Sequence, residues 1–227
     1  MKLAKAQIDF GLCTNNIDAL LSFWQTDVGL QLDHVLPVRR GQTQHRHDAL
    51  GSVIKINHIV KGLPQTTPSG YRELLIARPN LAHPQRLTDP DGNRVTLLPR
   101  GNEGVNQIGI RLTVRNLDAH RAFYTNVLEL EEQPTFDGAA FRAGETRLIL
   151  EEQPDAPVES PMQGHGWRYI TFQVFNVDEA HAKVLAAGGR EGLAPVTLGK
   201  TARISMILDP DGNWIELSQR ASIVGSL

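Results

Sequence analysis

The stretch "ILDPDGNWIEL", residues 207–217, places a tight turn between two apolar runs, and a close copy, "LTDPDGNRVTLLP", occupies residues 87–99. In each copy Asp-Pro-Asp-Gly favours a reverse turn, because proline fixes φ, the first aspartate can bond back to the backbone and glycine accepts a positive φ. The flanking runs have the composition and alternation of β-strands. The repeat therefore predicts two antiparallel hairpins in one duplicated chain.

The second hairpin carries an acidic residue that the first lacks. Because strand side chains alternate between faces, Trp214 and Glu216 share one face, and Ile215 and Leu217 share the other. The two aliphatic residues suit a face covered by helices. We therefore expect Glu216 on the opposite, concave face, whereas the first copy has Thr96 at the equivalent position.

A second repeat precedes the hairpins. Residues 15–32 and 115–132 each follow a strand-like run and read as a helix with a polar N-terminal region and an inward aromatic pair. The later half also contains an amphipathic helix pattern over 176–189, closed by glycine. At the matching place the first half has only "RPNLAHPQ", residues 78–85, whose two prolines exclude a useful helix. We therefore predict that one half has lost a helix and an adjoining stretch.

Composition narrows the class of protein. With 227 residues, 41% hydrophobic and 21% charged, the chain is long enough for one large or two small globular domains. A formal charge of −2 with scattered basic residues does not indicate a nucleic-acid partner. No apolar run has the length of a membrane span. The single cysteine, Cys13, excludes an internal disulfide, and we expect a cytoplasmic protein.

Together, the helix with its aromatic pair and the "DPDGNWIEL" hairpin resemble the vicinal oxygen chelate superfamily, which includes glyoxalases, bleomycin-resistance proteins and extradiol dioxygenases. The resemblance implies an α+β fold of two tandem glyoxalase/dioxygenase-like domains built from paired βαβββ modules. By it, the domains would occupy residues 1–101 and 102–227, and the four modules would run over about 1–62, 68–101, 104–158 and 164–220. The second module would be truncated and lack its helix.

In this superfamily, paired modules form a cup with a divalent metal on its floor. The resemblance therefore implies a site for a divalent metal, which is Mn, Fe, Mg, Ni or Zn. The sequence leaves open whether this chain has kept the metal. By position, the equivalents of the ligands are Asp9 and Gly109 on first strands, Tyr169 on the first strand of the fourth module, and Lys55 and Glu216 on late strands. No histidine falls at any of these positions. Glu216 with Asp9 would supply two hard oxygen ligands.

How the modules pair decides which residues meet, and the sequence leaves this open. If adjacent modules pair, Asp9 and Lys55 share a cup with Glu73. If the first module pairs with the fourth, they meet Tyr169 and Glu216 instead. In either case Lys55 can form an ion pair or hold a substrate carboxylate. The candidate site residues are Glu216 and Tyr169 for catalysis, Lys55, Glu73, Trp167 and Trp214 for substrate, and Glu216 with Asp9 for metal.

Two functions follow from the resemblance, and the residues do not choose between them. The first is an enzyme of the lyase, isomerase or dioxygenase kind that acts on a small oxygenated or aromatic metabolite. The alternative is a metal-free protein that sequesters an antibiotic or metabolite, as bleomycin-resistance proteins do. In both cases the partner is a small molecule. Exposed strand edges around the truncated module also suggest a homodimer.

Overall fold

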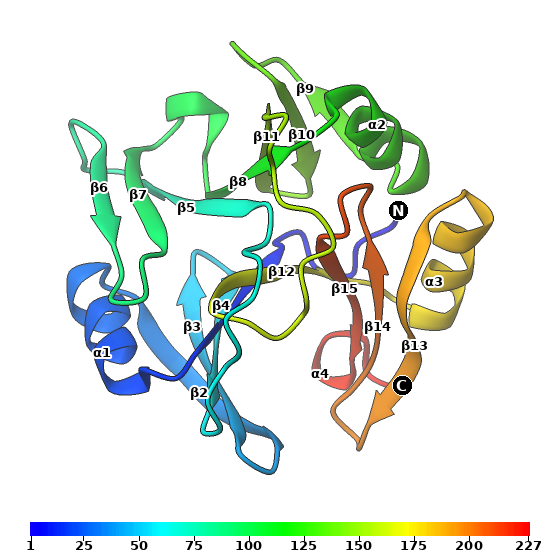
Figure 1. Ribbon diagram of the computed structural model, residues 1–227, viewed down its shortest axis with the longest axis horizontal. Helices are drawn as coiled ribbons and strands as arrows, with labels where there is room; N and C mark the ends of the chain where they lie inside the picture. The colour runs from blue at the N-terminus through cyan, green and yellow to red at the C-terminus, as the bar shows by residue number, and fades with distance from the viewer.

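The computed structural model describes residues 1–227 and contains two mixed β-sheets (Figure 1). The first sheet has eight strands in the order β13-β14-β15-β12-β1-β4-β3-β2, and the second has seven in the order β6-β7-β5-β8-β11-β10-β9. The strands of the first sheet are β1 (Asp9–Thr14), β2 (Gln31–Arg39), β3 (Gln42–Ala49), β4 (Ser52–Ile59), β12 (Gly166–Gln173), β13 (Arg190–Leu198), β14 (Ala202–Leu208) and β15 (Trp214–Arg220). Those of the second are β5 (Tyr71–Arg78), β6 (Gln85–Thr88), β7 (Arg94–Pro99), β8 (Ile108–Val114), β9 (Glu131–Gln133), β10 (Ala139–Ala143) and β11 (Thr146–Glu152).

The first module pairs with the fourth, and the second pairs with the third. Strands β1 and β12 join the outer modules in antiparallel register, with Asp9 opposite Thr171 and Gly11 opposite Tyr169. Strands β5 and β8 join the inner modules in the same way. Hydrogen bonds in both sheets therefore cross the expected boundary between residues 1–101 and 102–227. The division of the chain into these two domains stays a prediction.

The helices are short and are set by local sequence signals. Helices α2 (Leu117–Ala122) and α3 (Val177–Ala186) each begin after an asparagine whose side chain accepts a hydrogen bond from the helix, 2.8 Å from Ala119 N and 3.1 Å from Glu179 N. Helix α1 (Ile17–Ser22) occupies the matching place in the first module, and α4 (Ala221–Val224) follows β15. None of the helices is long and apolar enough to cross a membrane.

No helix follows β5 in the second module. Residues 79–84 connect β5 to β6 through turns, and Pro79 and Pro84 lie in this connection. The second module consists of three strands, while the fourth contains α3 and four strands. The two mixed sheets and few helices are the α+β architecture that the sequence predicts.

The core continues from one sheet to the other through aromatic side chains. The ring of Phe10 in β1 stacks on Trp167 in β12, with centroids 3.8 Å apart, and Trp24 meets Trp167 edge-on at 5.7 Å. Phe10 also contacts Tyr71 of the second sheet edge-on at 5.5 Å. These contacts bury large apolar surfaces, which is the main favourable contribution to folding.

The two Asp-Pro-Asp-Gly turns connect the sheets to one another. In each turn the first aspartate is buried and accepts three hydrogen bonds. Asp209 accepts from Asp211 N at 3.0 Å, Asn213 N at 2.8 Å and Asn213 Nδ2 at 2.9 Å. The second aspartate then contacts the other sheet, because Asp211 Oδ2 accepts from Arg115 N, which follows β8, at 2.7 Å. The first copy does the same, with Thr14 donating to Asp91 at 2.5 Å.

Replacing Asp209 by alanine should destabilise the protein by at least about 2 kcal/mol, because three buried N–H groups lose their acceptor. Urea unfolding followed by tryptophan fluorescence measures this change. The control is Asp118→Ala in α2, whose side chain is 93% exposed and whose loss should alter stability by no more than about 0.5 kcal/mol. Equal unfolding midpoints for the two variants would contradict the role assigned to the turn.

Candidate functional site

Four predicted site residues meet on the face of the first sheet opposite its helices. They lie on the central strands β1, β4, β12 and β15, which are hydrogen-bonded neighbours. Gly11 of β1 lies beside Lys55 of β4, and Thr171 lies between Asp9 and Glu216. This register follows from pairing the first module with the fourth. It brings Asp9, Lys55, Tyr169 and Glu216 into one group, which we call the polar cluster together with Arg46, Thr171 and Gln173.

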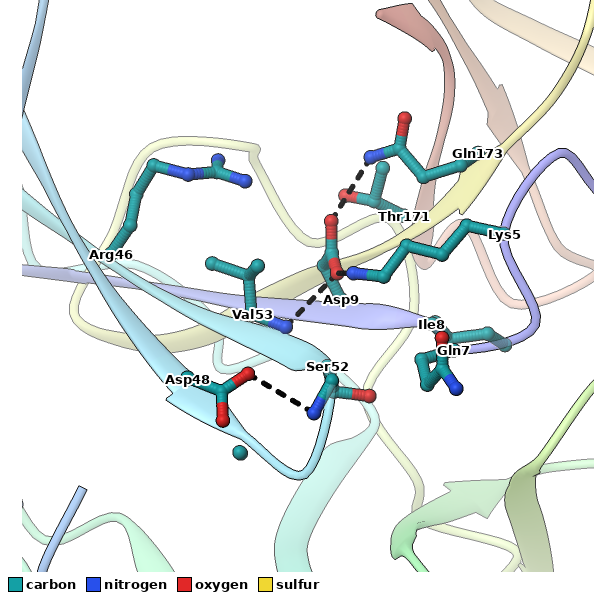
Figure 2. A network of polar contacts seen from close by, with 12 residues as sticks. Lys5, Gln7, Ile8, Asp9, Arg46, Asp48, Ser52, Val53, Thr171 and Gln173 are labelled. Carbon is teal, nitrogen blue, oxygen red and sulfur yellow. Dashed lines mark hydrogen bonds and ion pairs between the residues drawn. The ribbon is translucent and has the colours of Figure 1, made fainter. Parts of the chain in front are cut away.

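Asp9 is fully buried, and Figure 2 shows the side chains around it. Its carboxylate accepts hydrogen bonds from Lys5 Nζ at 2.8 Å, Val53 N at 3.0 Å and Gln173 Nε2 at 3.0 Å. Burial acts to raise the pKa of Asp9, but Lys55, Lys5 and these hydrogen bonds outweigh it and hold the pKa below its usual value. The carboxylate is therefore charged, and its partners are inside the protein.

Lys55 and Glu216 form a buried ion pair. Lys55 Nζ lies 3.1 Å from Glu216 Oε2 and donates to Thr171 Oγ1 at 2.6 Å, while Thr171 Oγ1 donates to Glu216 Oε2 at 3.1 Å. The Lys55 side chain is only 4% exposed and that of Glu216 11%. Burial lowers the pKa of Lys55, although Glu216 and Asp9 oppose this effect. A cation thus lies between two carboxylates at the centre of the sheet.

Tyr169 covers the neighbouring part of the face. Its hydroxyl accepts hydrogen bonds from Asn57 Nδ2 at 3.1 Å and Gln44 Nε2 at 3.3 Å, and Lys55 Nζ lies 5.3 Å from its ring centroid. Burial raises the pKa of Tyr169 well above its usual value, so the phenol stays protonated. Gly11 makes this position possible, because a Cβ there would lie 2.3 Å from the Tyr169 ring.

Arg46 belongs to the polar cluster, but it and its neighbours, residues 44–48, are absent from the candidate site residues that the sequence indicates. They belong to strand β3, and Arg46 lies opposite Lys55 in the register of β3 and β4. Arg46 is 4% exposed, and its guanidinium donates to Gln44 Oε1 at 2.7 Å and has a buried Nε without a partner. Figure 2 shows Arg46 extending toward the group around Asp9 without reaching it. The period-two alternation of residues 42–49 is the signal that places Gln44 and Arg46 on one face.

The other predicted site residues lie elsewhere. Glu73 belongs to the second sheet, where it accepts from Arg111 Nε at 3.0 Å and Thr96 Oγ1 at 2.5 Å. Trp167 lies in the core against Phe10 instead of on the ligand-facing side expected. The reason is a bulge: Gly11 pairs with Tyr169, but Leu12 pairs with Trp167, so the alternation shifts by one residue.

Apolar residues line one side of the polar cluster. Met206 lies opposite Glu216 across β14 and β15, and Leu193 lies opposite Met206 in the edge strand β13. Trp214 shares the face of Glu216, is partly exposed and donates its indole N–H to Ser160 O at 2.7 Å. On the other side, β3 presents Gln44 and Arg46. The face is therefore polar and cationic toward β3 and apolar toward β13.

The donor set of the polar cluster does not fit a divalent metal. Asp9 and Glu216 are its only carboxylates. Asp9 already accepts hydrogen bonds from Lys5, Val53 and Gln173. Oε2 of Glu216 already accepts hydrogen bonds from Lys55 and Thr171. A metal bound by both carboxylates would have to displace the Lys55 ammonium or face its positive charge. The structure contains no group of three or more His, Cys, Asp and Glu side chains arranged to hold a metal ion.

The lowered pKa of Asp9 predicts how stability depends on pH. A carboxylate whose pKa is depressed in the folded state stabilises the protein above its unfolded value of 3.8 and loses this effect as pH falls through the folded pKa. Asp9→Asn should therefore be less stable than the wild type near neutrality, and the difference should shrink on acidification below pH 3.8. Urea unfolding of both proteins across this range measures it; a difference independent of pH would contradict the assignment.

Solved structures share this fold over nearly the whole chain. Glyoxalase I from Zea mays matches 96% of this chain and 95% of its own, with a TM-score of 0.77 and 15% identity. A candidate dioxygenase from Bacillus subtilis matches 95% of this chain and 86% of its own, with a TM-score of 0.74 and 14% identity. At such identities the likeness concerns the fold. No curated protein matches the sequence.

The sequence itself matches a family model described as Glyoxalase/Bleomycin resistance protein/Dioxygenase superfamily over residues 104–217. This match covers the third and fourth modules and includes the hairpin with Glu216. With the shared fold, it confirms the resemblance seen in the duplicated turns and helices. The chain therefore belongs to the glyoxalase/bleomycin resistance protein/dioxygenase superfamily.

Proposed function

We propose that the polar cluster is the functional site, and that it binds a small oxygenated molecule through its own cations without needing a metal. The observation that carries this proposal is the buried Lys55 ammonium, 3.1 Å from Glu216 and opposite the incompletely bonded guanidinium of Arg46. Buried cations with unused donors are costly unless an anion or a polar oxygen completes their hydrogen bonds.

The charges of the polar cluster favour an anionic group on the ligand. Lys55 and Arg46 are joined by Arg220 at the end of β15, whose pKa is lowered by burial and by Arg46. Against them stand Asp9 and Glu216, with Asp33 acting on Arg220, and Asp9 has Lys5 as a further partner. Positive charge is therefore in excess. Guanidinium groups match a carboxylate or an enolate oxygen in geometry as well as charge.

The apolar side of the face favours a hydrocarbon or aromatic body. Leu193 and Val196 on edge strand β13 are 44% and 39% exposed, and Met206 of β14 lies beside Glu216. Trp214 adds an aromatic surface fixed by its bond to Ser160. A ligand with an oxygenated anionic end and an apolar end would satisfy both sides at once. This supports the binding of a small aromatic or oxygenated metabolite.

The Lys55–Glu216 pair also favours a second candidate, a lyase or isomerase that moves a proton next to a carbonyl. Such a reaction needs a base for the proton and a cation for the oxygen that becomes negative. Glu216 would take the proton from carbon, and the Lys55 ammonium, with the Tyr169 hydroxyl, would stabilise the enolate oxygen. The two groups lie 3.1 Å apart, so one substrate can contact both.

Binding by the wild type should be detectable with mandelate or benzoylformate, which combine a ring with adjacent oxygens. Arg46→Met should weaken this binding by about 10- to 100-fold, the usual effect of losing a charged hydrogen bond. Isothermal titration calorimetry measures the affinity. The control Arg86→Met removes an exposed arginine from β6 of the second sheet and should change nothing. Absence of binding to both probes, or equal affinities of the two variants, would refute the site.

For the enzymatic candidate, the test is exchange of the carbon-bound protons of 2-hydroxyacetophenone with deuterium, followed by NMR. The wild type should accelerate exchange over buffer, and Glu216→Gln should lose at least about 100-fold because it lacks the base. EDTA should leave the wild-type rate unchanged. Exchange that persists in Glu216→Gln would rule out the glutamate as the base, and exchange abolished by EDTA would show that a metal is needed.

A further inference from the structure

A cavity of about 600 Å³ lies where the two sheets meet, away from the polar cluster. Its walls come from the turn between β3 and β4 of the first sheet, at Leu50, and from β5, β10 and β11 of the second, at Ala77, Arg142 and Arg147. Gln107 holds this junction together, since its Nε2 donates to Ala49 O, Leu50 O and Ser52 Oγ at 3.0, 3.0 and 2.8 Å. A volume of this size accommodates a small metabolite.

Three arginines line the cavity. Arg100 is exposed, and its side chain has no hydrogen-bond or ion-pair partner in the protein. Arg147 is partly buried, donates to Pro134 O at 2.5 Å and has no carboxylate within ion-pair distance, and its Nε is buried without a partner. Burial lowers the pKa of Arg147 against the attraction of Glu103. Arg142 pairs with Glu131 on the surface, at 2.5 Å, and such exposed pairs break at little cost.

The acidic side chains around the cavity are already engaged. Glu145, the one carboxylate in its lining, accepts from Gln7 Nε2 at 2.6 Å. Glu103 pairs with Arg111 at 2.9 Å. Arg111 also binds Glu73 and Glu151, at 3.0 and 2.7 Å, so this group of acids has its own internal cation. The guanidinium groups of Arg100 and Arg147 are left without anionic partners.

The backbone fixes one of these arginines in place. Gly104 has a φ of +71°, and a Cβ there would lie 2.8 Å from Arg147 Nη1. The Gly104 backbone therefore lies close to the Arg147 guanidinium, and the hydrogen bond from Arg147 Nη2 to the backbone oxygen of Pro134 restricts its position. Such a fixed cation binds an anion at a smaller entropic cost than a mobile surface side chain.

We propose that this cavity is a second binding site, for a compact small molecule with at least two anionic oxygen groups. Phosphate and carboxylate oxygens both match the planar donors of arginine, and three arginines around one cavity can contact two such groups together. The polar lining supplies no large apolar wall, which sets this ligand apart from the one proposed for the polar cluster. The second site stands independently of that function.

Pyrophosphate and citrate are the probes, and they separate phosphate-bearing from carboxylate-bearing ligands. Isothermal titration at low ionic strength should show saturable binding of at least one of them, with one site per chain. The double variant Arg100→Gln/Arg142→Gln changes two exposed side chains and should weaken binding at least tenfold. The matched control Arg86→Gln/Arg94→Gln removes the same charge from exposed positions on β6 and β7 and should leave the affinity unchanged.

Failure of both probes to bind, or equal losses in the two double variants, would overturn the proposal, since only net charge would then matter. Arg46→Met separates the two sites. Polyanion binding that survives in Arg46→Met but falls in Arg100→Gln/Arg142→Gln supports the second site, even if mandelate does not bind. Polyanion binding that is lost in Arg46→Met would place the anion at the polar cluster and refute the proposal of a second site.

Discussion

The antiparallel pairing of β1 with β12 is the contact on which the rest of the structure depends. It joins the first module to the fourth and leaves the second and third to pair through β5 and β8. Gly11 permits it, because only a residue without a side chain leaves room for the Tyr169 ring. The same pairing aligns Asp9, Thr171 and Glu216 across three strands, so the topology and the candidate site have a single origin.

The polar cluster has an internal cation at its centre, and this decides what chemistry it supports. Lys55 is held by Glu216 and Thr171, and each carboxylate of the cluster already has protein partners. The second sheet repeats the arrangement with Arg111 among three glutamates. In both sheets a basic side chain lies among acidic ones, and in the second sheet the three glutamates outnumber Arg111. Arg46 in the first sheet and Arg100 and Arg147 at the junction have no ion-pair partner in the protein, and these guanidinium groups favour anionic ligands.

Sequence patterns predicted the local structure well where one signal dominated. The repeated Asp-Pro-Asp-Gly turns, the helices after Asn116 and Asn176 and the family itself follow from short motifs. The position of Glu216 follows from strand alternation. The sequence patterns failed to place a side chain where the strand was irregular or where no motif marked the residue. A bulge moved Trp167 into the core, and no motif marked Arg46 of β3 as a site residue.

The sequence by itself determined the elements, the duplication, the family and the face on which Glu216 lies, because each depends on neighbouring residues and on a fixed periodicity. Only the tertiary structure decided that Lys55 meets Glu216, that Glu73 belongs with Arg111 and that three arginines surround one cavity. These contacts join residues far apart in the chain. Their formation depends on which modules pair, and the hydrogen-bonding edges of similar modules carry no local signal for that choice.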